Sequence, residues 1–187
     1  MSIEREYFCL LSEVATPSNE KVNGIKDDKL PYIGLEHMET ETPTLIGKAD
    51  SSYSSSTNGV FHTGDVLFGK LRPYLRKCVG VDFSGYCSTD IIVLRPKDGV
   101  DPSFAAKVFQ SDKVFREAAR TSFGTKMPRT SWSQLSQLRV FLPAPEEQRR
   151  IAEILDTLDE TIRRTEQVIA KLQRMKQGLL HDLLTLG

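Results

Sequence analysis

The chain has 187 residues, of which 39% are hydrophobic, and its 25 basic and 25 acidic side chains leave a net charge of zero. A balanced charge excludes nucleic-acid binding through a global positive field, so any such surface must come from local clusters of cations. No apolar stretch reaches the length of a membrane span, and the N-terminus, residues 1–6, does not resemble a signal peptide. We therefore expect a cytoplasmic protein with one domain and one extended helix.

Cysteine and histidine patterns argue against a metal site. The cysteines Cys9, Cys78 and Cys87 are too few and too scattered for zinc, and their odd number suits a reducing compartment. Cys78 and Cys87 lie in strand-like stretches, where we expect them to pack as small apolar residues. The histidines lack metal-ligand spacing and are expected on the surface or in loops; they are His37, His62 and His181.

Short β-branched stretches separated by turns occupy the first half of the chain. They predict strands at residues 31–35, 64–69, 76–81 and 89–94, which would form a small, twisted, largely antiparallel sheet. Residues 1–29 have a mixed pattern without a clear element. Between the first two strands, residues 39–58 are polar and rich in serine and threonine. They are either a solvated loop or a functional loop whose side chains, around Tyr53, read base edges.

Helical signals begin at Asp101-Pro102, where aspartate suits the N-cap and proline the first helical position. A second helix is predicted over residues 111–119 and a short one over 131–138. A strand over residues 139–142 then leads to the hinge Pro143-Ala144-Pro145.

The last quarter of the chain predicts one long helix. Pro145 suits the first helical position. After it, apolar residues recur with a mean step close to 3.5 when Thr165 fills the one skipped turn, which is the period of a coiled-coil seam held for about five heptads. At 1.5 Å per residue this helix would be roughly 60 Å long. The fold class is therefore α+β: a sheet with short helices over residues 1–142, followed by a long coiled-coil helix over 143–187.

The seam of this helix needs a cover. Either it lies on the chain's own globular part, or it pairs with a second helix, from another copy or another protein. The second interpretation is favoured because roughly 60 Å exceeds the roughly 35 Å diameter of a domain of this size. The predicted dimerisation residues are Ile151, Leu155, Leu158, Ile162, Ile169, Leu172, Met175, Leu179 and Leu183, with Leu186 continuing the pattern.

Motifs for catalysis are absent from the sequence. It contains no Walker loop, dinucleotide-binding glycine pattern, nucleophile elbow or paired-histidine zinc motif. No Asp/Glu arrangement suggests a magnesium nuclease. The sequence therefore favours a binding protein without a catalytic site of its own.

Two basic segments are candidates for phosphate contacts. The first supplies Lys70, Arg72, Tyr74, Arg76 and Lys77, where cations would hold phosphates and tyrosine would stack or hydrogen-bond. The alternative is an ordinary solvated basic turn. The second segment supplies Thr125, Lys126, Arg129 and Ser131, whose hydroxyls and backbone N–H groups precede a helix. Its alternative is a capped helix with Trp132 in the core.

Several motifs together resemble the type I restriction–modification specificity subunits. In the globular part they are residues 64–74 (GDVLFGKLRPY), 88–90 (STD), 94–96 (LRP) and 124–129 (GTKMPR). The most specific is the helix start, residues 142–156 (LPAPEEQRRIAEILD), and residues 175–180 (MKQGLL) resemble the family's usual helix end.

This resemblance implies a DNA-reading subunit that brings methyltransferase subunits, and a DNA-translocating nuclease subunit, to a bipartite sequence. S-adenosylmethionine and ATP chemistry would belong to those partners, and this chain would hold no cofactor. Family members commonly contain two recognition domains and two spacer helices, whereas this sequence has one of each. We therefore expect two copies, paired antiparallel through the helix, to read an inverted repeat and to receive methyltransferase helices on their outer faces.

Three alternatives remain open. The first is a stand-alone DNA-binding regulator that dimerises through the same helix. The second is a truncated remnant that folds but assembles with no partner. The third is a nuclease that motif patterns do not identify. Tight DNA binding without a methyltransferase partner would indicate the first, a monomer at high concentration the second, and metal-dependent cleavage the third.

Overall fold

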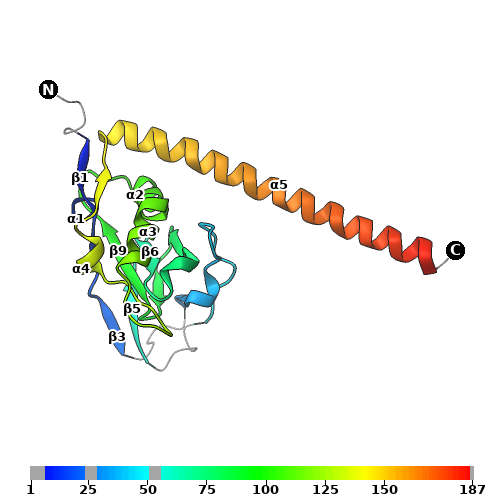
Figure 1. Ribbon diagram of the computed structural model, residues 1–187, viewed down its shortest axis with the longest axis horizontal. Coiled ribbons are helices and arrows are strands. Elements are labelled where there is room, and N and C mark those ends of the chain that lie inside the picture. Colours follow the sequence, from blue (N-terminus) through cyan, green and yellow to red (C-terminus); the bar gives the residue numbers. More distant parts are fainter. Residues whose placement is uncertain (1–6, 24–28, 51–55, 186–187) are drawn as a thin grey trace. The chain divides into compact units, whose positions relative to one another are not determined.

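The structure is a computed structural model that describes residues 7–23, 29–50 and 56–185 (Figure 1). The chain forms two compact units, unit 1 over Met1–Arg149 and unit 2 over Arg150–Gly187. Unit 1 holds the sheets and short helices, together with the first turn of the long helix. The domain boundary after residue 142 stays a prediction.

Unit 1 has the α+β composition that the sequence predicts. Its strands are β1 (Phe8–Leu10), β2 (Ala15–Pro17), β3 (Lys21–Asn23), β4 (Tyr32–Ile33), β5 (Thr57–Phe61), β6 (Val66–Gly69), β7 (Cys78–Gly80), β8 (Gly85–Cys87), β9 (Ile91–Pro96) and β10 (Arg139–Phe141). Its helices are α1 (Leu11–Val14), α2 (Pro102–Gln110), α3 (Asp112–Arg120) and α4 (Trp132–Leu135), with the 3-10 turns η2 (Leu35–His37) and η4 (Pro73–Leu75).

The strands form three sheets in the described residues, where one sheet was expected. Two have four strands, in the orders β2-β9-β6-β7 and β3-β5-β8-β4, and the third pairs β1 with β10. Neighbouring strands are antiparallel except β4 and β8, which run parallel, so the largely antiparallel character is confirmed. The difference arises because β1 pairs with a segment at the other end of unit 1, a contact that no local pattern reveals.

Strand β6 lies at the centre of unit 1 and is buried along its whole length. Its side chains alternate: Val66 and Phe68 join a core with helices α2 and α3, whereas Leu67 joins a second core with the other four-stranded sheet. In the first core the Phe68 ring stacks on Phe115 with centroids 5.2 Å apart. Unit 1 therefore has three layers, helices on one sheet and that sheet on the next, and burial on both faces explains the uninterrupted apolar run of β6.

Local signals placed several elements correctly. The Asp101 side chain caps α2 by accepting a hydrogen bond from the Phe104 N–H at 3.0 Å, as predicted. Cys78 and Cys87 are buried in β7 and β8, and desolvation raises the pKa of the Cys87 thiol to about 12. Both behave as the small apolar residues that the sequence indicated.

The long helix α5 spans Pro145–Thr185, which confirms the predicted element. Ile151 is half-buried, and the predicted seam residues from Leu155 to Leu183 are exposed, all but Leu155 by about half or more. Leu186 lies outside the described residues. Across the described chain, no helix combines the length and hydropathy needed to cross a bilayer.

Candidate nucleic-acid interface

The structure brings the two basic segments of the sequence together. The first, here called the basic loop (residues 70–77), follows β6; the second, the Gly124 turn (residues 122–130), follows α3. Backbone hydrogen bonds join them, from Arg72 N–H to Pro128 O at 2.7 Å and from Thr130 N–H to Lys70 O at 3.0 Å. Leu71 and Arg129 form a β-bridge between these bonds. One continuous surface thus carries candidate residues that are more than fifty positions apart in sequence.

The basic loop has an unusual backbone. Arg72 and Arg76 flank η4 with φ angles of 51° and 53°, in the left-handed region that non-glycine residues rarely adopt. Such conformations cost free energy and persist where surrounding contacts enforce them, often at functional sites. Buried Pro73 anchors the loop, and Tyr74 is 56% exposed beside it. The loop is therefore a fixed structure that presents its side chains, rather than an irregular solvated turn.

The Gly124 turn is closed by two hydrogen bonds, each 2.9 Å long, between the backbones of Phe123 and Arg129. Gly124 has φ of +102°, and a Cβ there would lie 3.2 Å from the Met127 carbonyl oxygen. A side chain at this position would be strained, so the turn depends on glycine. Thr125 and Lys126 are exposed at its tip.

Three of the predicted DNA-binding cations have partners inside the chain. Arg76 forms an ion pair with Asp112 at 2.5 Å, and Lys77 Nζ donates to the Leu35 carbonyl at 2.7 Å. Arg129 donates to both carboxylate oxygens of Asp90, at 2.9 and 3.3 Å. The hydrogen bond from Arg76 lowers the pKa of Asp112, and the Asp90 carboxylate raises the pKa of Arg129. These contacts fix the loop and the turn, so the three residues have a structural role whether or not they also touch DNA.

The remaining cations of this surface are Lys70, Arg72 and Lys126. Within residues 7–23, 29–50 and 56–185, none of the three forms an ion pair. Arg72 and Lys126 are exposed and Lys70 is half-buried. Unpaired cations on adjoining segments suit a polyanion whose phosphates repeat at short intervals.

The Ser131 side chain is exposed, but its hydroxyl is hydrogen-bonded within its own segment. Its hydroxyl lies 2.9 Å from Ser133 Oγ and donates to Gln134 Oε1 at 3.1 Å. Trp132 is half-buried and packs against the first core, with its ring 6.3 Å from that of Phe109. The predicted helix over 131–138 is only the short α4. Ser131 precedes it but forms no side-chain hydrogen bond to its backbone, so the capping part of the alternative interpretation is wrong.

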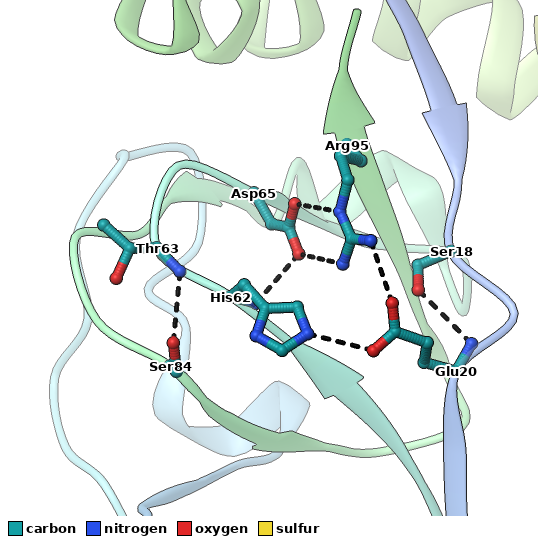
Figure 2. A network of polar contacts seen from close by, with 7 residues as sticks. All are labelled: Ser18, Glu20, His62, Thr63, Asp65, Ser84 and Arg95. Atoms are coloured by element: carbon teal, nitrogen blue, oxygen red, sulfur yellow. Dashed lines mark hydrogen bonds and ion pairs between the residues drawn. The ribbon is translucent and has the colours of Figure 1, made fainter.

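A second polar cluster joins the two four-stranded sheets at the opposite end of β6 (Figure 2). Asp65 is buried and accepts hydrogen bonds from Arg95 Nε at 3.1 Å and from the backbone N–H of His62 at 2.8 Å. Glu20 accepts from Arg95 Nη1 at 2.8 Å and lies 2.9 Å from His62 Nε2. Every charged group here has a partner, so the cluster ties strands together. In the described part of the chain no acidic, histidine or cysteine side chains gather as a metal site.

The comparison with known families decides the class of this protein. A family model described as "Type I restriction modification DNA specificity domain" matches residues 15–174, which is most of the chain. The chain belongs to this family. The motifs that carry the sequence resemblance all fall within the matched range, except the helix-end motif at residues 175–180, which begins directly after it.

Known relatives are longer than this chain. It is 25% identical over 159 residues to the type I restriction enzyme EcoDI specificity subunit of Escherichia coli, covering 80% of this chain and 34% of that protein. It is 28% identical over 175 residues to the putative MjaX specificity subunit of Methanocaldococcus jannaschii, covering 89% and 39%. The HsdS subunit from Thermoanaerobacter tengcongensis shares the fold, with a TM-score of 0.72, 24% identity, and coverage of 93% of this chain and 47% of that one.

The structure gives a physical reason for three of the family-like motifs. Asp65 and Arg95, from the first and third motifs, are the ion pair that joins β6 to β9. Gln148, from the helix-start motif, is 2% exposed. It accepts from the Asp101 N–H at 2.9 Å and donates to Pro143 O at 2.8 Å, so it fastens the first turn of α5 to the loop before α2. Residues of all three motifs therefore help to hold unit 1 together.

Sequence reasoning missed two residues of the candidate interface. Phe123 and Met127 lie on the Gly124 turn and are 73% and 46% exposed. Their positions in an otherwise polar turn were the available signal, but an apolar residue in a turn normally indicates packing. The centre of the serine- and threonine-rich loop predicted over residues 39–58, residues 51–55 with Tyr53, lies outside the described residues, so its base-reading role stays a prediction.

Proposed function

We propose that this protein is a sequence-specific DNA-recognition component of a type I restriction–modification complex, without catalysis of its own. Unit 1 would contact duplex DNA, and α5 would pair with a second copy to set the distance between two recognition units. The observation that supports this most directly is the joined surface of basic loop and Gly124 turn, on a chain that belongs to the specificity-domain family.

Charge supports DNA as the ligand of that surface. Lys70, Arg72 and Lys126 would neutralise phosphates, and Arg129 would sit between them on its Asp90 anchor. Because the net charge of the whole chain is zero, this contact would act at short range. We therefore expect moderate affinity for DNA by the isolated chain and a steep dependence on salt.

Pairing through α5 follows from its exposed apolar edge. The seam residues repeat every three or four positions, with one step of seven between Ile162 and Ile169, along a helix of 41 residues and roughly 61 Å. An edge of this kind is stable in water when a second helix covers it, and an antiparallel pair would place one recognition unit at each end. The chain spans 34% and 39% of the two curated relatives. Two paired copies would supply the second domain and helix, and would read an inverted repeat.

The outer face of α5 would receive methyltransferase subunits. On that face Arg163 and Arg164 both pair with Glu160, at 2.8 and 2.6 Å, so charged groups are already arranged there for a polar contact. In this proposal S-adenosylmethionine and ATP are bound by partner subunits, with a restriction subunit as a further partner, and the complex works in the cytoplasm.

The DNA surface is tested with the double variant Lys70→Ala, Arg72→Ala. Loss of two phosphate contacts should weaken binding to any duplex about tenfold or more and reduce the slope of log Kd against log salt by about 2. Fluorescence anisotropy with a 50-bp duplex at several salt concentrations measures both quantities. Lys107→Ala, on α2, is the matched control. Equal slopes for the double variant and wild type would contradict the assignment.

The cellular role is tested by comparing genomic methylation with and without the gene. The proposal predicts that one methylated, bipartite, inverted-repeat motif disappears in the deletion strain. Co-purification should also recover a methyltransferase subunit. Tight specific DNA binding with an unchanged methylome and no such partner would instead support the stand-alone regulator.

A further inference from the structure

Exposed apolar side chains of unit 1 are concentrated on the candidate interface. Among its described residues, six large hydrophobic side chains are exposed: Phe8, Ile46, Tyr74, Phe123, Met127 and Phe141. Phe8 and Phe141 contact each other, with ring centroids 5.9 Å apart. Three of the other four lie on the basic loop and the Gly124 turn, two segments that are hydrogen-bonded to one another.

Phe123 is the most exposed of the six side chains, and its backbone is held in place. Its backbone is paired with Arg129, and Arg129 is held in turn by its bridge to Leu71 and its two bonds to Asp90. A phenyl ring left in water forfeits roughly 1.5–3 kcal/mol of burial free energy. A rigid turn that presents such a ring, without covering it, is typical of a contact made in a complex.

The charges around Phe123 indicate which kind of partner it meets. Lys126 is on the same turn, Arg72 is hydrogen-bonded to that turn, and neither forms an ion pair within the described residues. An apolar pocket on a protein would match the ring alone. A polyanion with apolar base stacks between its phosphates matches both the ring and the cations, as in proteins that insert phenylalanine or methionine between base pairs.

We propose that Phe123, with Met127 on the same turn, is an apolar wedge that enters duplex DNA and partly unstacks one base step, while Lys126 and Arg72 hold the flanking phosphates. This rests on the proposed function and adds to it a mode of sequence discrimination. Pyrimidine–purine steps unstack most easily. The wedge therefore selects such a step within the target without forming a hydrogen bond to it.

The first test measures affinity. The full-length wild-type chain is used to enrich duplexes from a random-sequence 50-bp pool, and the variants are then titrated against them. Phe123→Ala should bind roughly tenfold more weakly, as expected for one lost base contact, with an unchanged salt slope because no phosphate contact is removed. Lys126→Ala should reduce the slope by about 1. Phe8→Ala, another exposed phenylalanine of unit 1, should bind like wild type.

The second test reports unstacking directly. With 2-aminopurine placed in turn at each adenine of the enriched duplex, wild type should raise the fluorescence at one step, and Phe123→Ala should not. The wedge is overturned if Phe123→Ala binds DNA within twofold of wild type, or if the two proteins give the same fluorescence pattern. In that case, weaker binding by the double variant Lys70→Ala, Arg72→Ala would still support DNA recognition by this surface. If wild type enriches no duplex, the proposed function fails and the wedge fails with it.

Discussion

Unit 1 buries most of its large apolar side chains, whereas the long helix α5 exposes most of its own. The described part of unit 1 encloses two apolar cores and leaves six large hydrophobic side chains exposed. In α5 twelve are exposed, in steps that follow the helix from Ile154 to Leu184. Unit 1 encloses its own apolar cores, whereas α5 leaves an apolar edge in water. In the proposal above, a second helix covers that edge.

The polar groups of the two regions also differ in burial. Unit 1 buries Asp65 and Gln148, and both are fully engaged in hydrogen bonds. The charges of α5 lie on its surface, where Glu160 pairs with two arginines and its pKa falls to about 2, first through the hydrogen bond from Arg163. Buried polar groups specify one arrangement of neighbours and are costly to remove, whereas exposed ion pairs contribute little. Perturbations of the two regions should therefore differ in size and in kind.

The largest effect is expected at the exposed edge of α5. Leu158→Asp with Leu172→Asp removes four buried leucines from a dimer, each worth about 1.5 kcal/mol or more, a total of roughly 6 kcal/mol. We expect the dissociation constant to rise about ten-thousandfold and the chain to be monomeric. Sedimentation equilibrium measures this, with Gln167→Asp as the control because residue 167 falls on the opposite side of the heptad. A double variant with the oligomeric state of wild type would contradict the seam.

An intermediate effect is expected at Gln148, where the two regions join in sequence. In Gln148→Glu a carboxylate replaces the amide that donates to Pro143 O and Gly99 O, so two carbonyls face an anion. The cost should be about 3 kcal/mol, seen as a fall in Tm of roughly 8 °C by circular dichroism. Lowering the pH toward 4 should restore part of the lost stability, because the protonated side chain of the introduced glutamate can again donate a hydrogen bond.

Glu147→Gln is the matched control for that variant, since Glu147 is the exposed neighbour of Gln148. It should melt within about 1 °C of wild type, as surface substitutions do. An unaltered Tm in Gln148→Glu would mean that the buried amide does not stabilise unit 1.

The contrast between regions also explains what sequence reasoning could and could not predict. Helix α5 follows from a strong local period, and α2 from its Asp101-Pro102 start, because both signals lie within the element itself. Five strands were not predicted: β1, β2, β3, β5 and β8. All but β5 have three residues, and each gains its stability from partners elsewhere along the chain. The prediction of a single sheet was wrong for the same reason.

The candidate interface was predicted residue by residue but not as a surface. Charge identified Lys70, Arg72 and Lys126, yet only the bridge between Leu71 and Arg129 places their segments side by side. Charge also gave no way to separate Arg76 and Lys77, which are held within the chain, from cations that remain available. Apolar exposure at Phe123 is likewise a property of the folded turn, and the sequence alone would assign that ring to a core.

The smallest effect is expected at Glu20, in the cluster that ties the two four-stranded sheets. Hydrogen bonds from His62 and then Arg95 lower the pKa of Glu20 below its ordinary value of 4.5. A lowered folded-state pKa stabilises the fold above pH 4.5, and this contribution is lost as the pH falls through the folded value. Because Glu20 is about half exposed, it should amount to less than about 1 kcal/mol. Glu20→Gln should therefore lower Tm by about 2 °C or less at pH 7, and this difference should shrink below pH 4.5. Asp98→Asn, at an exposed turn outside this cluster, should show no such pH-dependent difference. A Tm deficit of Glu20→Gln that persisted undiminished at pH 3 would mean that its cause is packing and not charge.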